Sequence, residues 1–161
     1  MKKCVLLLSA FLVCLLLVCC TRIKERYPEG KDTVESFGDG TYQILRGNFE
    51  DKECVGLSFS PAGVHLIPKV KTYQEKNGCI YLVGVDEGYY INGKKVSWKF
   101  AVYAVIDLSN NHIQICAIPE IDSEYNFRIS QAALDTGLIT IIGDYSVFSQ
   151  KDRLVLDAMK G

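Results

Sequence analysis

The chain has 161 residues, with 18 lysines and arginines against 19 aspartates and glutamates and a formal net charge of −1 at pH 7. This near-balance lacks the clustered basic residues that bind nucleic acid, so we expect no nucleic-acid partner. Beyond its apolar N-terminus the chain is long enough for one ordinary domain and too short for two.

The N-terminus has the pattern of a targeting signal. Lys2 and Lys3 precede an uncharged run from Cys4 to Val18 that is rich in leucine and valine. Cations followed by such a run are typical of export or membrane-targeting segments, which are not part of a folded core.

The end of this run, Leu17-Val18-Cys19-Cys20, resembles the signal of bacterial lipoproteins. In that signal a leucine, a tolerant position and a small residue precede a cysteine that is lipidated and becomes the mature N-terminus. The resemblance implies that residues 1–19 are a signal peptide and that Cys20 carries the lipid, with Cys19 standing where glycine, alanine or serine is usual. Two or more acyl chains bind a membrane stably. The resemblance therefore implies a lipoprotein on the periplasmic or surface face of a bacterial cell envelope.

Two other fates of the N-terminus stay open. The apolar run is at the lower end of the roughly 17–25 residues that cross a bilayer as a helix, so it also fits an uncleaved N-terminal signal anchor. Cleavage after Cys19 or Cys20 without lipidation would instead give a secreted protein. Basic residues lie on both sides of the run and favour neither orientation of an anchor.

Residues 20–36 are predicted to tether the lipid to a single domain at 37–161. The stretch from Thr21 to Ser36 is polar and charged and contains Pro28 and Gly30, a composition typical of linkers. The alternative is an ordered first turn or helix that belongs to the domain.

The first part of this domain is predicted to consist of strands. Short runs of β-branched and aromatic residues, separated by Gly, Pro, Asn and Asp, predict strands at 41–46, 54–59, 63–67 and 79–85. A second signal is Asn92-Gly93, which supplies the positive φ angles of a type I′ turn. Gly88–Ile91 and Lys94–Trp98 are therefore expected to pair as a hairpin.

An apolar run from Trp98 to Leu108 predicts a central strand that is covered on both faces. Residues 109–111 then form a turn, and residues 112–118 return antiparallel and end at Pro119. Alternation along the returning strand places Ile113, Ile115 and Ala117 on one face and His112, Gln114 and Cys116 on the other.

Helices are expected toward the C-terminus. One is predicted within 123–136, with Gly137 just beyond its end, followed by a buried strand at 138–142. Residues 149–152 resemble a capping box that opens a final helix. The apolar face of that helix is expected to consist of Leu154, Val155 and Ala158. The predicted fold is a single α+β domain on an antiparallel sheet with one or two C-terminal helices.

The sequence contains no motif with the spacing of a catalytic or metal site, so we expect no enzymatic activity, no metal and no cofactor. His65 and His112 are isolated in predicted strands, whereas a zinc site needs several converging ligands. An envelope hydrolase that combines Cys116 or Ser58 with His112 is the less favoured alternative.

Three cysteines, Cys54, Cys79 and Cys116, lie beyond the N-terminal segment, each in an apolar run. In an oxidising envelope two of them can form one disulfide, and the spacing does not choose among the three pairings. Each is otherwise expected to be a small buried apolar side chain.

Aromatic residues are dense in the middle of the chain. Such residues are favoured at protein interfaces and equally as cross-strand partners in a sheet. Tyr89 and Tyr90 are adjacent and should point to opposite faces of a regular strand, so at least one is expected to be exposed near the hairpin tip. Tyr89, Tyr90 and Lys94 are therefore the candidate protein-binding residues.

Together these features predict a membrane-tethered bacterial envelope lipoprotein that binds a protein partner without catalysis, as inhibitory or immunity-type modules do. A structural lipoprotein without a dedicated ligand is the main alternative, and an envelope hydrolase is the second.

Overall fold

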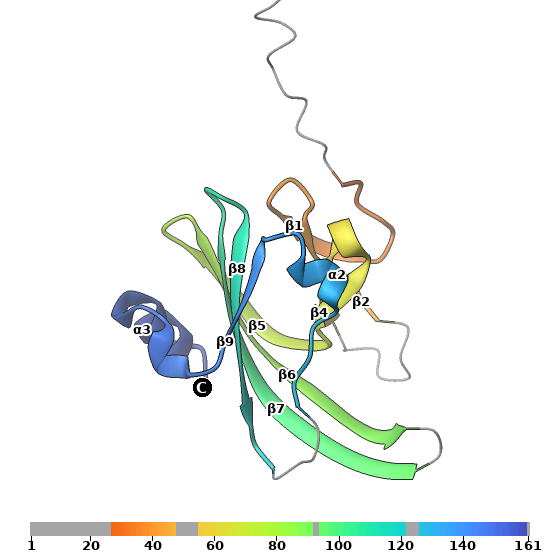
Figure 1. Ribbon diagram of the computed structural model, residues 1–161. Coiled ribbons are helices and arrows are strands. Elements are labelled where there is room, and N and C mark those ends of the chain that lie inside the picture. Colours follow the sequence, from red (N-terminus) through yellow and green to blue (C-terminus); the bar gives the residue numbers. More distant parts are fainter. Residues whose placement is uncertain (1–26, 48–54, 92–93, 122–125, 161) are drawn as a thin grey trace, which may run out of the picture.

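A computed structural model describes residues 27–47, 55–91, 94–121 and 126–160, and most of these lie in two β-sheets (Figure 1). The N-terminal sheet is an antiparallel meander of β1 (Thr33–Phe37), β2 (Tyr42–Arg46), β3 (Val55–Phe59) and β4 (Val64–Ile67). The C-terminal sheet contains, in spatial order, β5 (Lys69–Lys76), β6 (Cys79–Ile91), β7 (Lys94–Asp107), β8 (His112–Pro119) and β9 (Ile139–Ile142). Its strands pair antiparallel except β9, which is parallel to β8.

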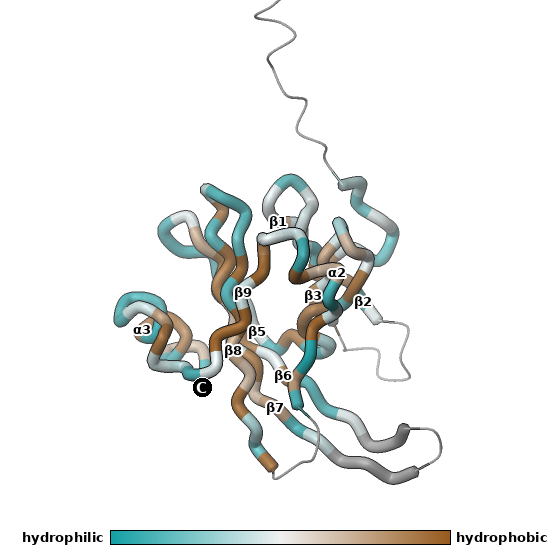
Figure 2. Tube along the Cα trace, in the orientation of Figure 1, coloured by the Kyte–Doolittle hydropathy of each residue, from teal (hydrophilic) through white to brown (hydrophobic). Residues whose placement is uncertain are grey.

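The main core lies between the two sheets. Alternate positions of each strand point inward, so Tyr42 and Ile44 of β2 and Leu57 and Phe59 of β3 are fully buried. They share one cluster with inward residues of the C-terminal sheet, namely Ile80, Leu82, Phe100, Val102, Ala104, Ile106, Ile113 and Ile115. The turns at the ends of the strands are hydrophilic (Figure 2).

The opposite face of the C-terminal sheet is covered by α3 (Gln150–Ala158), which lies on the side away from the N-terminal sheet (Figure 1). Val155 and Leu156 of α3 pack with Tyr81, Tyr103 and other outward residues of the sheet in a second buried cluster. Because β7 lies in the middle of this sheet with a core on each face, its long apolar run needs no alternation. The predicted central strand is confirmed.

The chain crosses from one sheet to the other at Pro68, between β4 and β5. The crossing backbone lies close over Gly84 of β6, where an added Cβ would be 2.4 Å from the Lys69 carbonyl oxygen. Pairing registers shift beside the crossing, between Leu57 and Ser58 and between Val70 and Thr72. Bulges of this kind bend strands at the corners of packed sheets.

The folded part begins earlier than the sequence predicted. Residues 33–37 form β1, and upstream of it the Tyr27 amide donates to the Asp39 carbonyl at 3.0 Å. Residues 27–36 therefore belong to the fold rather than to the tether predicted at 20–36. The segment has the composition of a linker because β1 is an edge strand in which Phe37 alone is buried.

The four strands predicted before residue 86 are confirmed as β2, β3, β4 and the first half of β6. The hairpin is also confirmed, because β6 and β7 pair antiparallel up to Ile91 opposite Lys94. The Asn92-Gly93 turn itself lies outside the described residues. The sequence did not predict β5, an edge strand with Val70 as its one buried residue.

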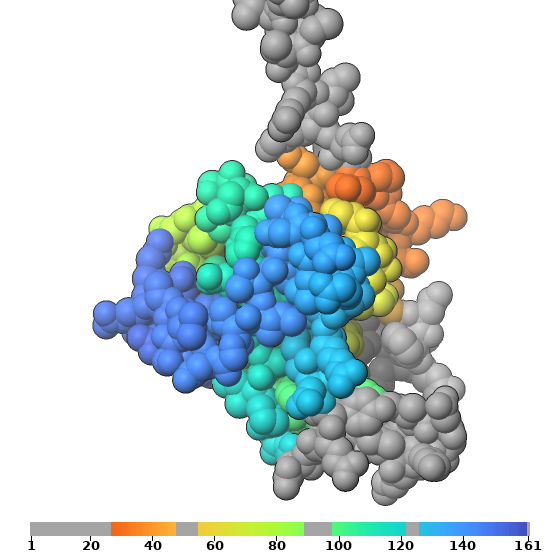
Figure 3. All heavy atoms as spheres, viewed as in Figure 1, coloured from red at the N-terminus to blue at the C-terminus, as the bar shows by residue number. Residues whose placement is uncertain are grey.

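The C-terminal segment, from α2 (Gln131–Leu134) to α3, covers one side of the molecule in blue in Figure 3. The helix predicted within 123–136 is confirmed only as these four residues. Gly137 follows with φ 72° and donates its amide to the Leu134 carbonyl. The buried strand predicted at 138–142 forms as β9, but it is a parallel edge strand with exposed Ile141.

The final helix begins as predicted, because Ser149 accepts a hydrogen bond from the Asp152 amide at 3.2 Å. Its predicted apolar face is confirmed at Val155 and wrong at Leu154 and Ala158. Leu154 is 67% exposed, whereas Val155 and Leu156 are buried. The Tyr81 hydroxyl donates to Asp152 at 2.8 Å and turns the Asp152 side of the helix toward the sheet. Two sheets with two short C-terminal helices are consistent with the predicted α+β class and, since strands dominate, also with a mostly-β class.

Candidate functional site

The most prominent feature of the described chain is a two-stranded arm. β5 pairs with β6 only as far as Lys69 opposite Val85, and β8 pairs with β7 only from Pro119 opposite Phe100. Beyond these pairs, residues 86–91 and 94–99 pair with each other and extend past the rest of the sheet (Figure 1). We call these two stretches the arm.

All three predicted binding residues lie at the end of the arm. The register places Ile91 opposite Lys94 and Tyr90 opposite Lys95. Between Gly88 and Tyr90 the register shifts, so the regular alternation expected for Tyr89 and Tyr90 is interrupted at this point. The structure does not describe the side chains of these residues. Their backbone positions bring Tyr89, Tyr90 and Lys94 together at one end of the molecule.

On its inner face, the arm is joined to the core by Trp98. The indole lies directly over Gly88, where an added Cβ would be 2.0 Å from two ring carbons. Its Nε1 donates to Asp86 Oδ1 at 3.2 Å, and the ring packs against the main core. An aromatic ring over a cross-strand glycine covers backbone that would otherwise be open to water. Trp98 therefore holds the two strands together where the arm leaves the body.

On its outer face, the base of the arm carries a row of alternating charges across four neighbouring backbone segments. Lys69 of β5 pairs with Glu87 of β6 at 2.7 Å, and Lys99 of β7 pairs with Glu120, just beyond β8, at 2.6 Å. Glu87 and Lys99 are themselves opposite each other in the β6–β7 ladder. Cross-strand pairs of opposite charge contribute roughly 0.2–1 kcal/mol each. The row could not be predicted from the sequence because it depends on the register of three strand pairs.

Past this row the arm is basic and aromatic. Residues 88–98 contain two lysines, two tyrosines and the chain's one tryptophan, and no aspartate or glutamate. This composition suits an interface with an acidic protein surface, where aromatic residues supply contact area and lysines supply charge complementarity.

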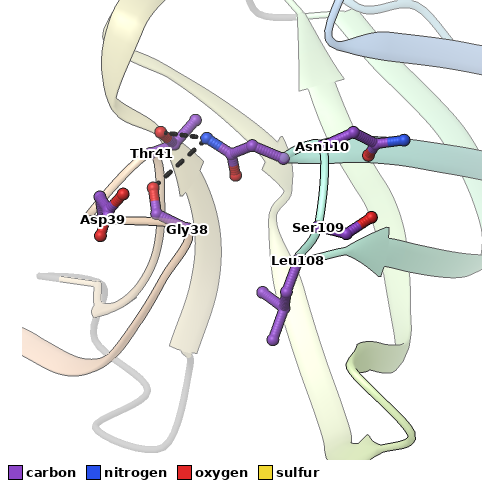
Figure 4. Close-up of a pocket in the computed structure, with 7 residues that line it drawn as sticks. Gly38, Asp39, Thr41, Leu108, Ser109 and Asn110 are labelled. Carbon is purple, nitrogen blue, oxygen red and sulfur yellow. Dashed lines mark hydrogen bonds between the residues drawn. The ribbon is translucent and has the colours of Figure 1, made fainter. Parts of the chain in front are cut away.

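A polar hollow of about 470 Å³ lies at the opposite end of the molecule. Figure 4 shows it between the β1–β2 turn, with Gly38, Asp39 and Thr41, and the β7–β8 turn, with Leu108, Ser109 and Asn110. The two turns are joined by Asn111, whose Nδ2 donates to Thr41 Oγ1 at 2.6 Å and to the Gly38 carbonyl at 3.3 Å.

The geometry of Asn111 indicates a clasp between turns rather than a binding site. Its Oδ1 is buried without a hydrogen-bond partner, but it faces Gly38, where an added Cβ would be 1.9 Å away. The oxygen is therefore covered by glycine backbone and is not offered to the hollow. Fully buried Tyr42 completes the clasp by donating to the carbonyls of Asn111, at 3.1 Å, and Leu138, at 3.2 Å.

The structure does not bring the hydrolase candidates together. Ser58 lies between inward-facing Leu57 and Phe59, so it is on the outer face of the N-terminal sheet, and its hydroxyl donates to the Val64 carbonyl. His112 is on the outer face of the other sheet and contacts Thr140 Oγ1 at 3.0 Å. Cys116 is four positions along β8 from His112, about 13 Å away.

The thiols described by the structure are both free, and neither is activated. Burial raises the pKa of Cys116, and the neighbouring Asp144 raises it further; burial followed by Asp107 raises the pKa of Cys79. A raised pKa disfavours the reactive thiolate.

The register also excludes one of the three predicted disulfide pairings. Cys79 is opposite Asp107, and Cys116 is opposite Tyr103 across the other edge of β7. The two cysteines are therefore about 10 Å apart across the sheet and about 13 Å along it. A disulfide needs Cα atoms closer than about 7 Å. Cys54, the partner in the other two pairings, lies outside the described residues.

Within the part of the chain that the structure covers, no three His, Cys, Asp or Glu side chains gather as metal ligands do. In the same residues no helix combines the length and apolar character needed to cross a membrane. Cys20 and the predicted signal peptide lie outside them. No protein-family model, curated protein or solved structure matches the chain.

Proposed function

We propose that this chain is a lipid-anchored protein of a bacterial cell envelope that binds a protein partner through the β6–β7 arm, as an inhibitory or immunity-type module. The observation that carries the binding role is the arm itself, which extends past both neighbouring strands. The lipid anchor is supported by the resemblance of Leu17–Cys20 to the lipoprotein signal.

Two properties of the arm support binding. The ladders with β5 and β8 end at Val85 and Phe100, so beyond its base the arm has no third strand among the described residues, and a second chain could add to its edge. Its base is braced on one face by Trp98 and on the other by the charge row, so the two strands are held together where the arm leaves the body. Such preorganisation lowers the entropy lost on binding.

The experiment compares two triple variants of the tagged, full-length chain expressed in a bacterial envelope. The first removes the arm residues by Tyr89→Ala, Tyr90→Ala and Lys94→Ala. The control makes the same number of alanine substitutions at exposed tyrosine and lysine positions of β5, namely Lys71→Ala, Tyr73→Ala and Lys76→Ala. Both are purified from detergent-solubilised membranes, and co-purifying proteins are quantified by mass spectrometry.

The wild type and the β5 variant should recover one protein in near-stoichiometric amount. The arm variant should lose it by roughly tenfold or more, because interface tyrosines often contribute about 1–2 kcal/mol each. Thermal unfolding of each variant shows whether the fold is intact. Equal recovery by the arm and β5 variants would contradict the binding role of the arm, and no stoichiometric protein with the wild type would favour a structural lipoprotein.

A further inference from the structure

The described part of the chain begins beside the β1–β2 turn. Tyr27, the first described residue, donates its amide to the Asp39 carbonyl at 3.0 Å. Its own carbonyl oxygen lies where a Cβ on Gly40 would come within 2.4 Å. One residue further, the Pro28 carbonyl accepts a hydrogen bond from Gln43 Nε2 at 3.3 Å. The start of the described chain is therefore fixed to the end of the molecule that carries the Asn111 clasp.

The arm lies at the opposite end. β7 begins at Lys94 in the arm and ends at Asp107, four residues before Asn111 in the clasp. Its 14 residues span roughly 43 Å at the usual rise of a strand. Figure 1 shows the same arrangement, with the β1–β2 turn at the top of the view and the β6–β7 arm at the bottom.

The connection from the predicted lipid site to Tyr27 is short. Residues 21–26 alone separate Cys20 from Tyr27. Even fully extended, this stretch reaches at most about 25 Å, which is less than the length of β7. It also contains Arg22, Lys24 and Arg26 against Glu25, a balance that attracts anionic headgroups. Residues 21–26, the spacer, are therefore too short for the molecule to turn over and place the tip of its arm on the bilayer.

We infer that the clasp end, formed by the turns at 38–41 and 108–111, faces the membrane and that the arm points into the aqueous space. This inference rests on the lipid anchor proposed above. It assigns the arm a partner that is a soluble protein, or a part of one that extends away from the bilayer, and not a lipid surface.

The single tryptophan gives a direct test, because Trp98 is at the base of the arm. The full-length mature lipoprotein is reconstituted in vesicles of phosphatidylethanolamine and phosphatidylglycerol that contain dansyl-labelled lipid. Energy transfer from tryptophan to dansyl is measured for the wild type and for a reporter variant, Trp98→Phe with Ser109→Trp, which moves the donor to the exposed turn of the clasp end. Mass spectrometry of the same preparation reports the acyl group on Cys20.

We expect transfer from residue 109 to be several-fold more efficient than transfer from Trp98. Insertion of a long Gly/Ser segment after Arg26 should raise transfer from Trp98, since the molecule can then turn over. Equal transfer from both sites, as expected for a molecule lying flat, would overturn the inference, and so would stronger transfer from Trp98. In either case an acyl group found on Cys20 by mass spectrometry would leave the proposed anchor intact. An unacylated Cys20 in the wild type overturns the anchor and, with it, the inference.

Discussion

At the scale of single residues, a glycine in β6, Gly84, allows the chain to pass closely over the sheet where it crosses from β4 to β5. Gly84 lies beneath the β4–β5 crossing, with the Lys69 carbonyl 2.4 Å and the Ile67 Cγ2 2.6 Å from the place of a Cβ. Both neighbours belong to the crossing segment, and one of them is backbone. The Lys69 carbonyl cannot move without displacing the chain as it passes between the sheets, and the Ile67 methyl group belongs to a fully buried side chain.

The substitution Gly84→Ala should therefore lower the free energy of unfolding by about 1–3 kcal/mol, the usual cost of overpacking. The matched control is Gly143→Ala, because no atom lies within 4 Å of a Cβ at that position. Urea unfolding of both variants measures the difference. A destabilisation of Gly143→Ala as large as that of Gly84→Ala would contradict this account of the crossing.

Buried tyrosines make the fold sensitive to alkali. Burial raises the pKa of Tyr42 and Tyr81 well above the ordinary value, and a hydrogen bond to Asp152 adds to the shift of Tyr81. Burial and then the hydrogen bond to Asp157 raise the pKa of Tyr145 to about 12. In the unfolded chain these tyrosines ionise near pH 10, so above that pH the folded chain binds more protons than the unfolded one.

The contribution of these tyrosines to the free energy of unfolding should accordingly be fully present below about pH 10 and fall as the pH rises further. Urea unfolding at about pH 8 and about pH 11 measures the loss, and tyrosinate absorbance should rise together with unfolding. Because Tyr81→Phe removes one of the ionising groups, its loss between the two pH values should be smaller than that of the wild type. An unchanged or larger loss in this variant would count against the role of Tyr81.

At the scale of elements, the arm depends on the contact between Trp98 and Gly88. We expect Trp98→Ala to speed amide hydrogen exchange in residues 86–91 and 94–99, because the ring that covers the strand pair is lost. Exchange in residues 100–107 should change little, since these residues lie between two buried clusters. Trp98→Phe, which keeps an aromatic ring, should show a smaller effect. Unchanged exchange in the arm of Trp98→Ala would show that another contact orders it.

Strands that bury two or more residues were predictable from the sequence, including the edge strands β4 and β9, whereas the edge strands that bury a single residue were not. The strands β2, β3, β4 and β6 follow from β-branched and aromatic runs, and Asn92-Gly93 predicted the hairpin that carries the candidate site. The edge strands β1 and β5 were missed because each buries one residue, Phe37 and Val70, among polar neighbours. Helix α3 was predicted, but its buried face depends on the contact between Asp152 and Tyr81 from distant parts of the chain.

The same limit applies to the candidate site. Tyr89, Tyr90 and Lys94 were chosen from a local turn signal and aromatic density, and the structure places them together on paired strands. That these strands extend past their neighbours follows from where β5 and β8 stop pairing, at Val85 and Phe100. Strand-end registers of this kind depend on tertiary packing and leave no local mark in the sequence.

At the scale of the whole molecule, the two ends have different roles in the proposed function. In this proposal the clasp end faces the membrane, and the tip of the arm at Lys94 lies roughly 43 Å from Asp107 along β7. Because residues 27–36 belong to the fold, the proposed lipid anchor at Cys20 would be separated from the fold by residues 21–26 alone, rather than by the whole of the predicted tether. With so short a spacer, a lipid anchor would hold the arm away from the bilayer.

The most direct test of this account is the mass of the mature N-terminus in the wild type and in the Cys20→Ala variant, both expressed in a bacterial envelope. We predict that the wild-type chain begins at Cys20, carries acyl groups and lacks residues 1–19, and that the Cys20→Ala chain keeps its signal peptide and carries no lipid. A wild-type chain that retains Met1, or one that begins near Cys20 without an acyl group, would contradict it.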